Sequence, residues 1–267
     1  MLSVSTLAGM ASTIPRTTLI TGASSGLGAE FAAQFARRGG DVVLLARRED
    51  RLRELADRLT RDHGIRADVI ALDLGEDDAA ALLRERLDAA GLRIDGLVNN
   101  AGFGMHGAVV DSDPAVLERM LRLNINALVA LTREFLPDVL GAGGTLVNIA
   151  SVAAHVPLPT MAAYGASKSF VLNFTEALAY EARGTGARVL AVSPGPTRTE
   201  FFDEIGDGAA AGGFQTAEEV VTRAMRALDA RSRPASVVSG WRNVVMTTAS
   251  RLLPRRAALA IAGRVVR

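Results

Sequence analysis

The sequence predicts an α/β protein with an open parallel sheet in a single domain. Short apolar runs rich in β-branched residues alternate with stretches whose apolar residues recur at helical spacing, and a glycine-rich turn follows the first run. No linker-like tract of Pro, Ser or Gly divides the 267 residues. The unbroken alternation therefore favours one domain, although this length allows two.

The composition limits the classes of function. Hydrophobic residues make up 49% of the chain and the net charge is +1, so the chain can bury a large core and has no overall attraction for polyanions. We expect no nucleic-acid partner. The absence of cysteine excludes disulfides and thiolate metal sites and fits a reducing, cytoplasmic location. Because the three histidines stand far apart without ligand spacing, we predict no bound metal.

Residues 1–15 form a tail of small residues that we expect to be disordered, unless translation starts at Met10. The tail lacks the basic start of a secretory signal and the arginines of a transit peptide. No window of the chain holds the roughly 18 apolar residues of a spanning helix. We place the main domain at 16–250, with a flexible substrate loop at about 199–214, and a basic amphipathic segment at 251–267.

The first predicted strand, 17–21, leads into a glycine-rich turn and a helix. Glycines let the backbone approach a pyrophosphate, and free N–H groups at the helix start favour its charge. A glycine-rich turn alone is weak evidence, and the spacing here is G-x-x-x-G-x-G rather than G-x-G-x-x-G. The candidate cofactor residues of this turn are Gly22, Ser24, Ser25, Gly26, Leu27 and Gly28.

The second predicted strand, 41–46, ends in Arg47 and Arg48. An NAD-specific site usually has a carboxylate here for the ribose 2′-hydroxyl, whereas a guanidinium can hold a 2′-phosphate with two parallel hydrogen bonds. The arginines therefore indicate NADP as the cofactor. They could instead begin a solvated helix; we favour the phosphate role for Arg47 and leave it open for Arg48.

Later strands end in small or polar residues, as expected at the ligand-binding edge of a parallel sheet. We predict these strands at 67–72, 94–98, 145–150 and 188–192, with a helix at 76–90. Asp73 could be only a helix cap, and Asn100–Gly102 could be only a simple turn. The functional alternative for both is a contact with a cofactor. The candidates for a cofactor contact are Asp73, Leu74, Asn100, Ala101, Gly102, Pro194, Gly195, Thr197 and Thr199, and the strand 145–150 delivers Ser151 to the same edge.

A long helix is predicted from Pro114 to Leu136, with Asp113 as its N-cap. Asn124 and Asn126 interrupt its apolar run. A buried amide needs a hydrogen-bond partner, so a structural role and a functional role compete.

A helix over 162–183 places Tyr164 and Lys168 on one face, because they are four residues apart. Lys168 is the only lysine among 30 basic residues. A neighbouring cation stabilises a phenolate and lowers the tyrosine pKa from about 10, which makes the phenol a better acid–base catalyst. Tyr-x-x-x-Lys is also a common surface pair, and only the surrounding motifs favour the catalytic interpretation.

The C-terminal third leaves alternatives open. Residues 200–213 combine Gly and Ala with phenylalanines, which fits either a mobile flap over an apolar substrate or a loop that packs down. Thr216 and Glu219 predict a capping box that starts a helix through Ala230. The basic segment 251–267 could touch anionic membranes, although we favour a helix packed on its own domain or a neighbouring subunit.

The motifs occur in the order and with the separations of a known family. Thr21–Gly28, Asn99–Gly102, Asn124, Ser151, Tyr164-x-x-x-Lys168 and Pro194-Gly195 together resemble the classical short-chain dehydrogenase/reductase family over roughly residues 16–230. The resemblance implies a doubly wound parallel sheet of the Rossmann type and NADP-dependent oxidation or reduction of a small to medium apolar alcohol or carbonyl compound. It also implies a homodimer or homotetramer.

The resemblance further implies a role for each motif residue. Tyr164 gives its proton to the carbonyl oxygen, Lys168 lowers the Tyr164 pKa and binds the nicotinamide ribose, and Ser151 polarises the carbonyl. Asn124 holds a water that reprotonates the site through Lys168. Tyr164 and Lys168 then contact the cofactor together with Gly22, Gly26, Gly28, Arg47, Asp73, Asn100 and Thr197. An NADP-binding sensor or scaffold without turnover is the alternative, but it would need neither Tyr164 nor Lys168.

Overall fold

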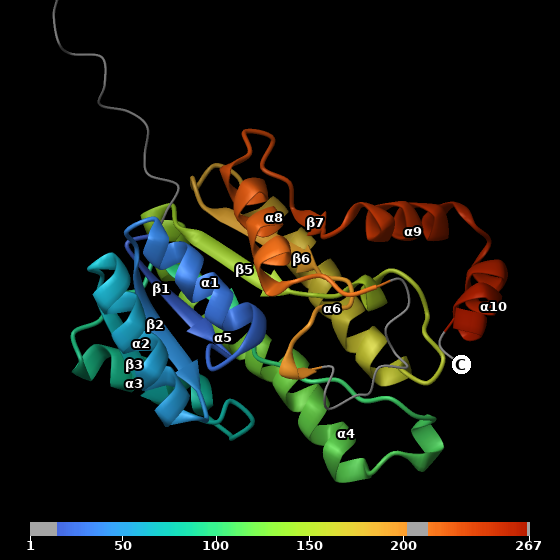
Figure 1. Ribbon diagram of the computed structural model, residues 1–267, viewed down its shortest axis with the longest axis horizontal. Coiled ribbons are helices and arrows are strands. Elements are labelled where there is room, and N and C mark those ends of the chain that lie inside the picture. The colour runs from blue at the N-terminus through green and yellow to red at the C-terminus, as the bar shows by residue number, and fades with distance from the viewer. Residues whose placement is uncertain (1–14, 202–212, 266–267) are drawn as a thin grey trace, which may run out of the picture.

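A seven-stranded parallel sheet forms the centre of the protein, as the computed structural model shows for the described residues 15–201 and 213–265 (Figure 1). The strand order β3-β2-β1-β4-β5-β6-β7 confirms the predicted doubly wound arrangement. The order reverses between β1 and β4, where open sheets of this kind bind ligands at the carboxyl ends of the strands. The strands are β1 (Thr17–Thr21), β2 (Asp41–Ala46), β3 (Ala67–Ala71), β4 (Gly96–Asn99), β5 (Thr145–Ile149), β6 (Arg188–Ser193) and β7 (Ser236–Val238).

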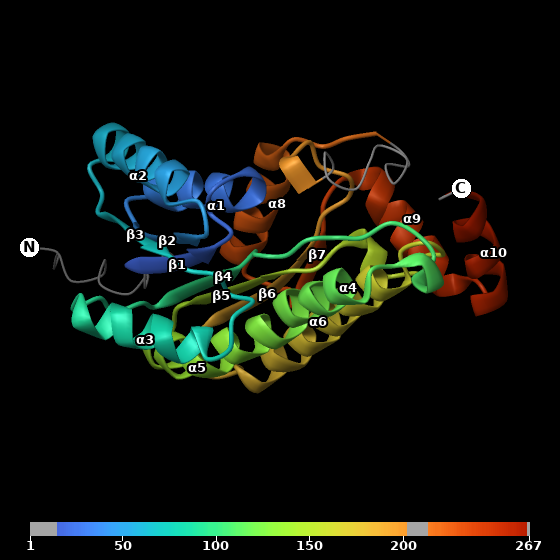
Figure 2. The same cartoon turned by 90° about the horizontal axis from the view of Figure 1, so that it is seen from below.

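Helices cover both faces of the sheet (Figure 2). One face carries α1 (Gly26–Arg37), α2 (Glu49–His63) and α8 (Ala217–Asp229). The other carries α3 (Ala79–Ala89), α5 (Leu128–Ala142) and α6 (Ala162–Glu181), with α4 (Pro114–Leu121) before α5. Because both faces are buried, the strands are continuous apolar runs rather than alternating ones.

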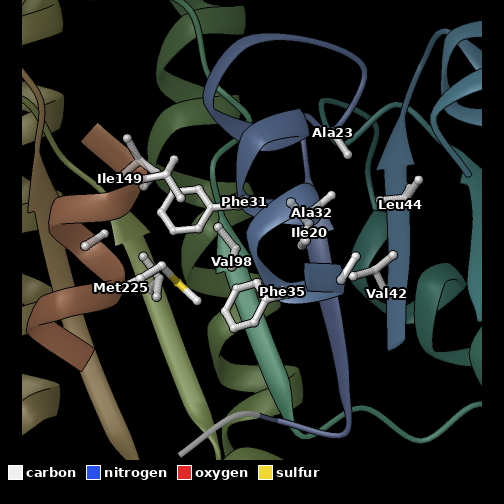
Figure 3. Packing of buried hydrophobic residues seen from close by; sticks show 14 of the residues in the cluster. Ile20, Ala23, Phe31, Ala32, Phe35, Val42, Leu44, Val98, Ile149 and Met225 are labelled. Carbon is white, nitrogen blue, oxygen red and sulfur yellow. The ribbon is translucent and has the colours of Figure 1, made fainter. Parts of the chain in front are cut away.

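The larger core cluster lies under α1, α2 and α8. Phe31 and Phe35 are one helical turn apart in α1, and their rings lie 6.5 Å apart at the centroids. Both rings are fully buried and pack beside Val98 and Met225 (Figure 3). This packing fixes the start of α1 against the end of β1, and therefore fixes the glycine-rich turn between them.

Several helix ends follow the signals in the sequence. Asp113 accepts a hydrogen bond from the Ala115 N–H at 2.8 Å, with Pro114 as the first helical residue. Both hydrogen bonds of the Thr216–Glu219 capping box are present. Gly64 ends α2 in the left-handed conformation that glycine favours.

The long central helix differs from the prediction. It continues past Pro137 to Ala142, because packing of buried residues such as Val139 outweighs the one backbone hydrogen bond that proline removes. Between α4 and α5 it also widens into a π-helical segment, η2 (Arg122–Ala127). Such π-bulges concentrate at functional sites.

Other boundaries move by a few residues. Strands β3 and β5 end one residue earlier than predicted, β6 ends one later, and β4 begins at Gly96. Helix α3 begins at Ala79, after Asp78 in a left-handed conformation. The three-residue strand β7 was not predicted, because so short a run has no periodicity and forms only by pairing with β6.

The C-terminal part forms two further helices, α9 (Trp241–Leu252) and α10 (Arg255–Val265), with Pro254 between them. The predicted boundary at residue 250 therefore falls inside α9. None of the helices in the described part of the chain is long and apolar enough to cross a membrane. The tail predicted at 1–15 lies outside the described residues except for Pro15, which is buried. Most of the substrate loop predicted at about 199–214, residues 202–212, also lies outside them.

Candidate active site

The glycine-rich turn lies between the end of β1 and the start of α1. Gly22 and Gly26 have φ of 64° and 55°, a conformation that side chains with a Cβ rarely adopt. A Cβ on Gly28 would collide with the Gly22 carbonyl oxygen and lie 2.6 Å from Asn100 Nδ2. The turn thus presents backbone N–H groups at a helix start, and its side chains are too small to block an approaching phosphate.

The end of β4 is tied to this turn by Thr21 and Asn100. The Thr21 hydroxyl accepts hydrogen bonds of 2.9 Å from the N–H groups of Asn100 and Ala101. Asn100 Nδ2 donates to the carbonyl oxygens of Thr21 and Gly22 at 3.0 and 3.2 Å. These bonds hold two strand ends at the switch point of the sheet in fixed register. The Thr21 hydroxyl has a part in this that its place at the start of the glycine-rich motif did not predict.

The two arginines after β2 lie in different surroundings. Arg48 donates to the Ser24 and Ser25 hydroxyls at 2.8 and 3.1 Å and forms an ion pair of 2.8 Å with Glu200. Arg51 contacts the same carboxylate, and these hydrogen bonds lower the pKa of Glu200 to about 2. Arg47 is 78% exposed and lies 3.9 Å from Asp73. Three guanidinium groups therefore face two carboxylates beside the glycine-rich turn.

Asp73 and Leu74 follow β3 on the same edge of the sheet. The Asp73 carboxylate accepts a hydrogen bond of 2.9 Å from the Gly75 N–H, so it stabilises a turn and does not cap α3. The Leu74 side chain is buried in the core cluster under α3, which leaves only its backbone for a ligand contact.

Tyr164 and Lys168 lie on the buried face of α6, as the spacing predicts. Lys168 Nζ donates a 2.8 Å hydrogen bond to the Ile149 carbonyl oxygen at the end of β5 and lies 5.9 Å from the centroid of the Tyr164 ring. Desolvation lowers the pKa of Lys168 to about 8. The lysine is thus fixed at a strand end with a pKa close to neutral.

Ser151 follows β5, and its hydroxyl accepts a 3.1 Å hydrogen bond from the Ala153 N–H. Burial raises the pKa of Tyr164 to about 12, and the hydrogen bond with Ser151 opposes that rise. This direction differs from the expected lowering by Lys168. The physical reason is that the phenol is almost fully buried and loses more from desolvation of the phenolate than it gains from its neighbours.

Asn124 lies in the π-helical segment and is 1% exposed. Its Oδ1 accepts from the Phe103 N–H at 3.1 Å, and its Nδ2 donates to the Phe103 carbonyl oxygen at 2.9 Å. Nδ2 also lies 3.3 Å from the Ser167 hydroxyl. The side-chain amide is therefore satisfied by the chain itself, and the role of holding a water stays a prediction. Asn126, in contrast, is exposed.

The turn after β6 closes the site from the other side. Pro194 O accepts from the Val152 N–H at 2.9 Å, which connects this turn to the segment after Ser151. Within the turn, the Thr197 hydroxyl donates a hydrogen bond to Gly195 O, and the Thr199 hydroxyl donates one to Thr197 O. The methyl group of Thr199 lies against Gly26, so the structure brings the candidates from three strand ends together around the switch point.

An apolar cluster surrounds Tyr164 and contains residues that the sequence analysis missed. Its buried members include Met120 and Met161, and the Phe201 ring lies 5.7 Å from the Tyr164 ring. Phe103, Met105 and Leu117 are partly buried against the cluster. The apolar face of α4 was a signal for Met120, but only the fold brings α4 beside α6. Among the described residues, no group of three or more His, Cys, Asp or Glu could hold a metal.

The fold and the paired tyrosine and lysine define a Rossmann-type oxidoreductase. The family model described as short chain dehydrogenase matches residues 16–210. Sulfoacetaldehyde reductase 2 of Chromohalobacter salexigens is 41% identical over 68% of this chain and 73% of its own. The chain belongs to the short-chain dehydrogenase family, whose members use a nicotinamide cofactor.

Solved structures agree with this family. A short-chain dehydrogenase from Sphingobium yanoikuyae in complex with NADPH is 36% identical, with a TM-score of 0.78 over 88% of this chain and 93% of that one. A bulky-bulky ketone specific alcohol dehydrogenase from Comamonas testosteroni is 32% identical, with a TM-score of 0.74 over 90% of this chain and 93% of that one.

Proposed function

We propose that this protein is an NADP-dependent reductase of small to medium apolar carbonyl compounds. The observation that carries the proposal is the position of Tyr164. Its hydroxyl has a hydrogen bond with Ser151, it shares the buried face of α6 with Lys168, and its ring is part of an apolar cluster. A carbonyl compound bound there would place its oxygen at the phenol and its apolar groups among methionine and phenylalanine side chains.

The residues present fit NADP. The glycine-rich turn leaves room for a pyrophosphate, and the excess of guanidinium over carboxylate groups at Arg47, Arg48 and Arg51 suits a 2′-phosphate. NADPH, when bound, supplies the hydride for the reduction. The relative crystallised with NADPH supports this choice of cofactor.

In this proposal the protein's own groups orient the carbonyl and deliver the proton. A phenol whose pKa is raised to about 12 is protonated at neutral pH, and so Tyr164 Oη can donate its proton to the carbonyl oxygen. The Ser151 hydroxyl orients that oxygen. Lys168, with a pKa near 8, is close enough to neutrality to return a proton to the site. Asn124 positions Phe103, the residue after Gly102, through its two backbone hydrogen bonds.

The lining of the site supports an uncharged substrate. A small cavity beside Tyr164 is bounded by Met105, Leu117, Thr160 and Met161, and its described lining residues carry no charged side chain. A sulfonate or carboxylate group would find hydroxyl groups but no cationic side chain among them. An apolar ketone or aldehyde is therefore proposed instead of the sulfoacetaldehyde named for one relative.

The cofactor proposal is tested by measuring the affinities for NADPH and NADH. We expect the parent to prefer NADPH, and Arg47→Ala and Arg48→Ala each to lose about 1–3 kcal/mol of that preference through a lost charge-assisted contact. Arg58→Ala, at an exposed arginine of helix α2, which follows Arg48, is the matched control and should keep the preference. Equal binding of NADPH and NADH by the parent would contradict the proposal.

A further inference from the structure

Helix α9 is amphipathic, but its polar side faces the domain and its apolar side faces outward, which is the opposite of the usual surface helix. The side that faces the domain carries Asn243, Thr247 and Ser250, whereas Trp241 is 73% exposed and Leu252 is 83% exposed. Along the outer side, Val244 and Val245 are also exposed. Surface helices normally bury their apolar stripe against the core, so this outer stripe is built to meet an apolar environment outside the chain.

Polar contacts fix α9 in this orientation. Asn243 Nδ2 donates to Ser239 O at 2.7 Å and lies 3.3 Å from Gln215 Oε1. The same amide fills the space where a Cβ on Gly195 would be. Thr247 is 4% exposed and returns its hydroxyl hydrogen bond to Asn243 O at 2.8 Å. The apolar side therefore cannot turn inward without loss of the Asn243 hydrogen bonds, of the packing against Gly195 and of the burial of Thr247.

Helix α10 extends the same surface. It packs on the domain through small residues: Ala258 and Ala262 are buried, and Gly263 lies against Pro159. Leu259 and Ile261 are exposed. We define the C-terminal surface as the exposed side chains of the last two helices: Trp241, Arg242, Val244, Val245, Leu252, Leu253, Arg256, Leu259 and Ile261. Helices α9 and α10 lie at the end of the molecule opposite α3 in both views (Figures 1 and 2).

The charge of this part of the chain is entirely basic. All 29 acidic residues of the chain lie at or before Asp229, and eight arginines follow it. A second copy of the chain that packed through the same surface would bring these positive charges together. An anionic lipid surface has the complementary charge, and its headgroup region accepts both tryptophan and the apolar stems of arginine.

We propose that the C-terminal surface binds anionic membranes peripherally. The apolar side chains of α9 and α10 enter the headgroup boundary, while Arg242 and Arg256 pair with lipid phosphates. The interaction is independent of turnover and of the cofactor.

The test uses the full-length protein and vesicles of phosphatidylcholine, with or without phosphatidylglycerol. Trp241 is the only tryptophan of the chain, so its fluorescence reports on this surface alone. We expect a blue shift of the emission and co-sedimentation with the phosphatidylglycerol vesicles, both weakened by salt. Vesicles of phosphatidylcholine alone should give much weaker binding.

Matched variants distinguish binding through the C-terminal surface from non-specific adsorption of the protein to vesicles. Val245→Ser/Leu252→Ser removes exposed apolar groups, and Arg242→Gln/Arg256→Gln removes two charges; each pair should weaken binding at least on the order of tenfold. The control Leu82→Ser/Arg93→Gln changes exposed residues at the other end of the molecule and should bind like the parent.

Three results would overturn the proposal. One is no binding to phosphatidylglycerol vesicles at low salt. Another is equal binding to neutral and anionic vesicles, since the arginines would then contribute nothing. The third is an emission of Trp241 that is already blue-shifted without lipid and moves to the red on dilution, which would assign the surface to a second copy of the chain. The affinity for NADPH, measured in the same variants, should equal that of the parent. A failure of the cofactor proposal can therefore be distinguished from a failure of the membrane proposal.

Discussion

Lys168 carries its ammonium group in a buried position, where desolvation lowers its pKa from 10.5 to about 8. A base with a lower pKa in the folded than in the unfolded protein destabilises the fold while it is charged, and the cost disappears as pH rises between these two values. The free energy of unfolding of the parent, compared with that of Lys168→Met, should therefore rise from pH 8 to 10.5 by roughly 3 kcal/mol.

Urea unfolding of both proteins at a series of pH values measures this difference. The comparison cancels most other titrating groups, and the raised pKa of Tyr164 affects stability only at pH 10 and above. A difference between parent and variant that does not change with pH would mean that Lys168 has an ordinary pKa.

Tyr164 is the proposed proton donor, and its ring also packs against Phe201. Tyr164→Phe keeps the ring and removes only the hydroxyl. We expect turnover with a ketone substrate to fall by about 10²–10⁴-fold, with the affinity for NADPH nearly unchanged. Tyr180→Phe, at an exposed position of the same helix, is the control. Loss of both turnover and cofactor binding would show that the residue is structural, and unchanged turnover would remove it from the mechanism.

At the scale of elements, the glycine-rich turn depends on the close approach of α1 to β1 and β4. Gly28→Ala places a methyl group against the Gly22 carbonyl and the Asn100 amide. The strain should lower the free energy of unfolding by about 1–3 kcal/mol and weaken NADPH binding.

Gly141→Ala is a suitable comparison for Gly28→Ala. Gly141 lies in helix α5 with open space where its Cβ would be. Alanine is the better helix former, so this variant should be as stable as the parent or more stable by up to about 1 kcal/mol. Thermal unfolding of both variants checks the pair, and equal destabilisation would contradict the steric explanation.

The π-helical segment shows how an element can be built around one contact. A regular helix would continue from α4 into α5, but η2 inserts a wider turn in which Asn124 meets both backbone polar groups of Phe103. Those two groups lie in an irregular segment after β4 and would otherwise lack a partner from secondary structure. The bulge therefore fixes the loop that packs against the apolar cluster beside Tyr164.

For the whole molecule, we expect a homodimer or homotetramer in which copies pair through the helices that carry Asn124 and Tyr164. Helix α6 exposes Phe170, whose ring stacks on Phe174 at 5.7 Å, so an apolar patch is available there. Phe170→Glu should shift the parent oligomer toward smaller species in light scattering, and Leu82→Glu on α3 should not. A parent that is monomeric at micromolar concentration would contradict the expectation.

The sequence predicted most elements because local signals and tertiary packing agree there. Strands β1 and β2 have the predicted bounds, and the capping residues Asp113 and Thr216 act as expected. The prediction was wrong where a long-range contact decides. Strand β7 forms because it pairs with β6, and α5 continues past Pro137 because its buried residues pack on the sheet.

The sequence by itself determined the family, the doubly wound sheet, and the residues at the strand ends that form the candidate site. Motif spacing and hydrophobic periodicity are local properties, and the parallel topology brings strand ends to one edge. Only the tertiary structure decided the state of these residues: Tyr164 with a raised pKa, Asn124 bound to Phe103, and α9 with its apolar side outward. Burial, desolvation and the pairing of polar groups depend on which segments pack together, and spacing along the chain does not contain that information.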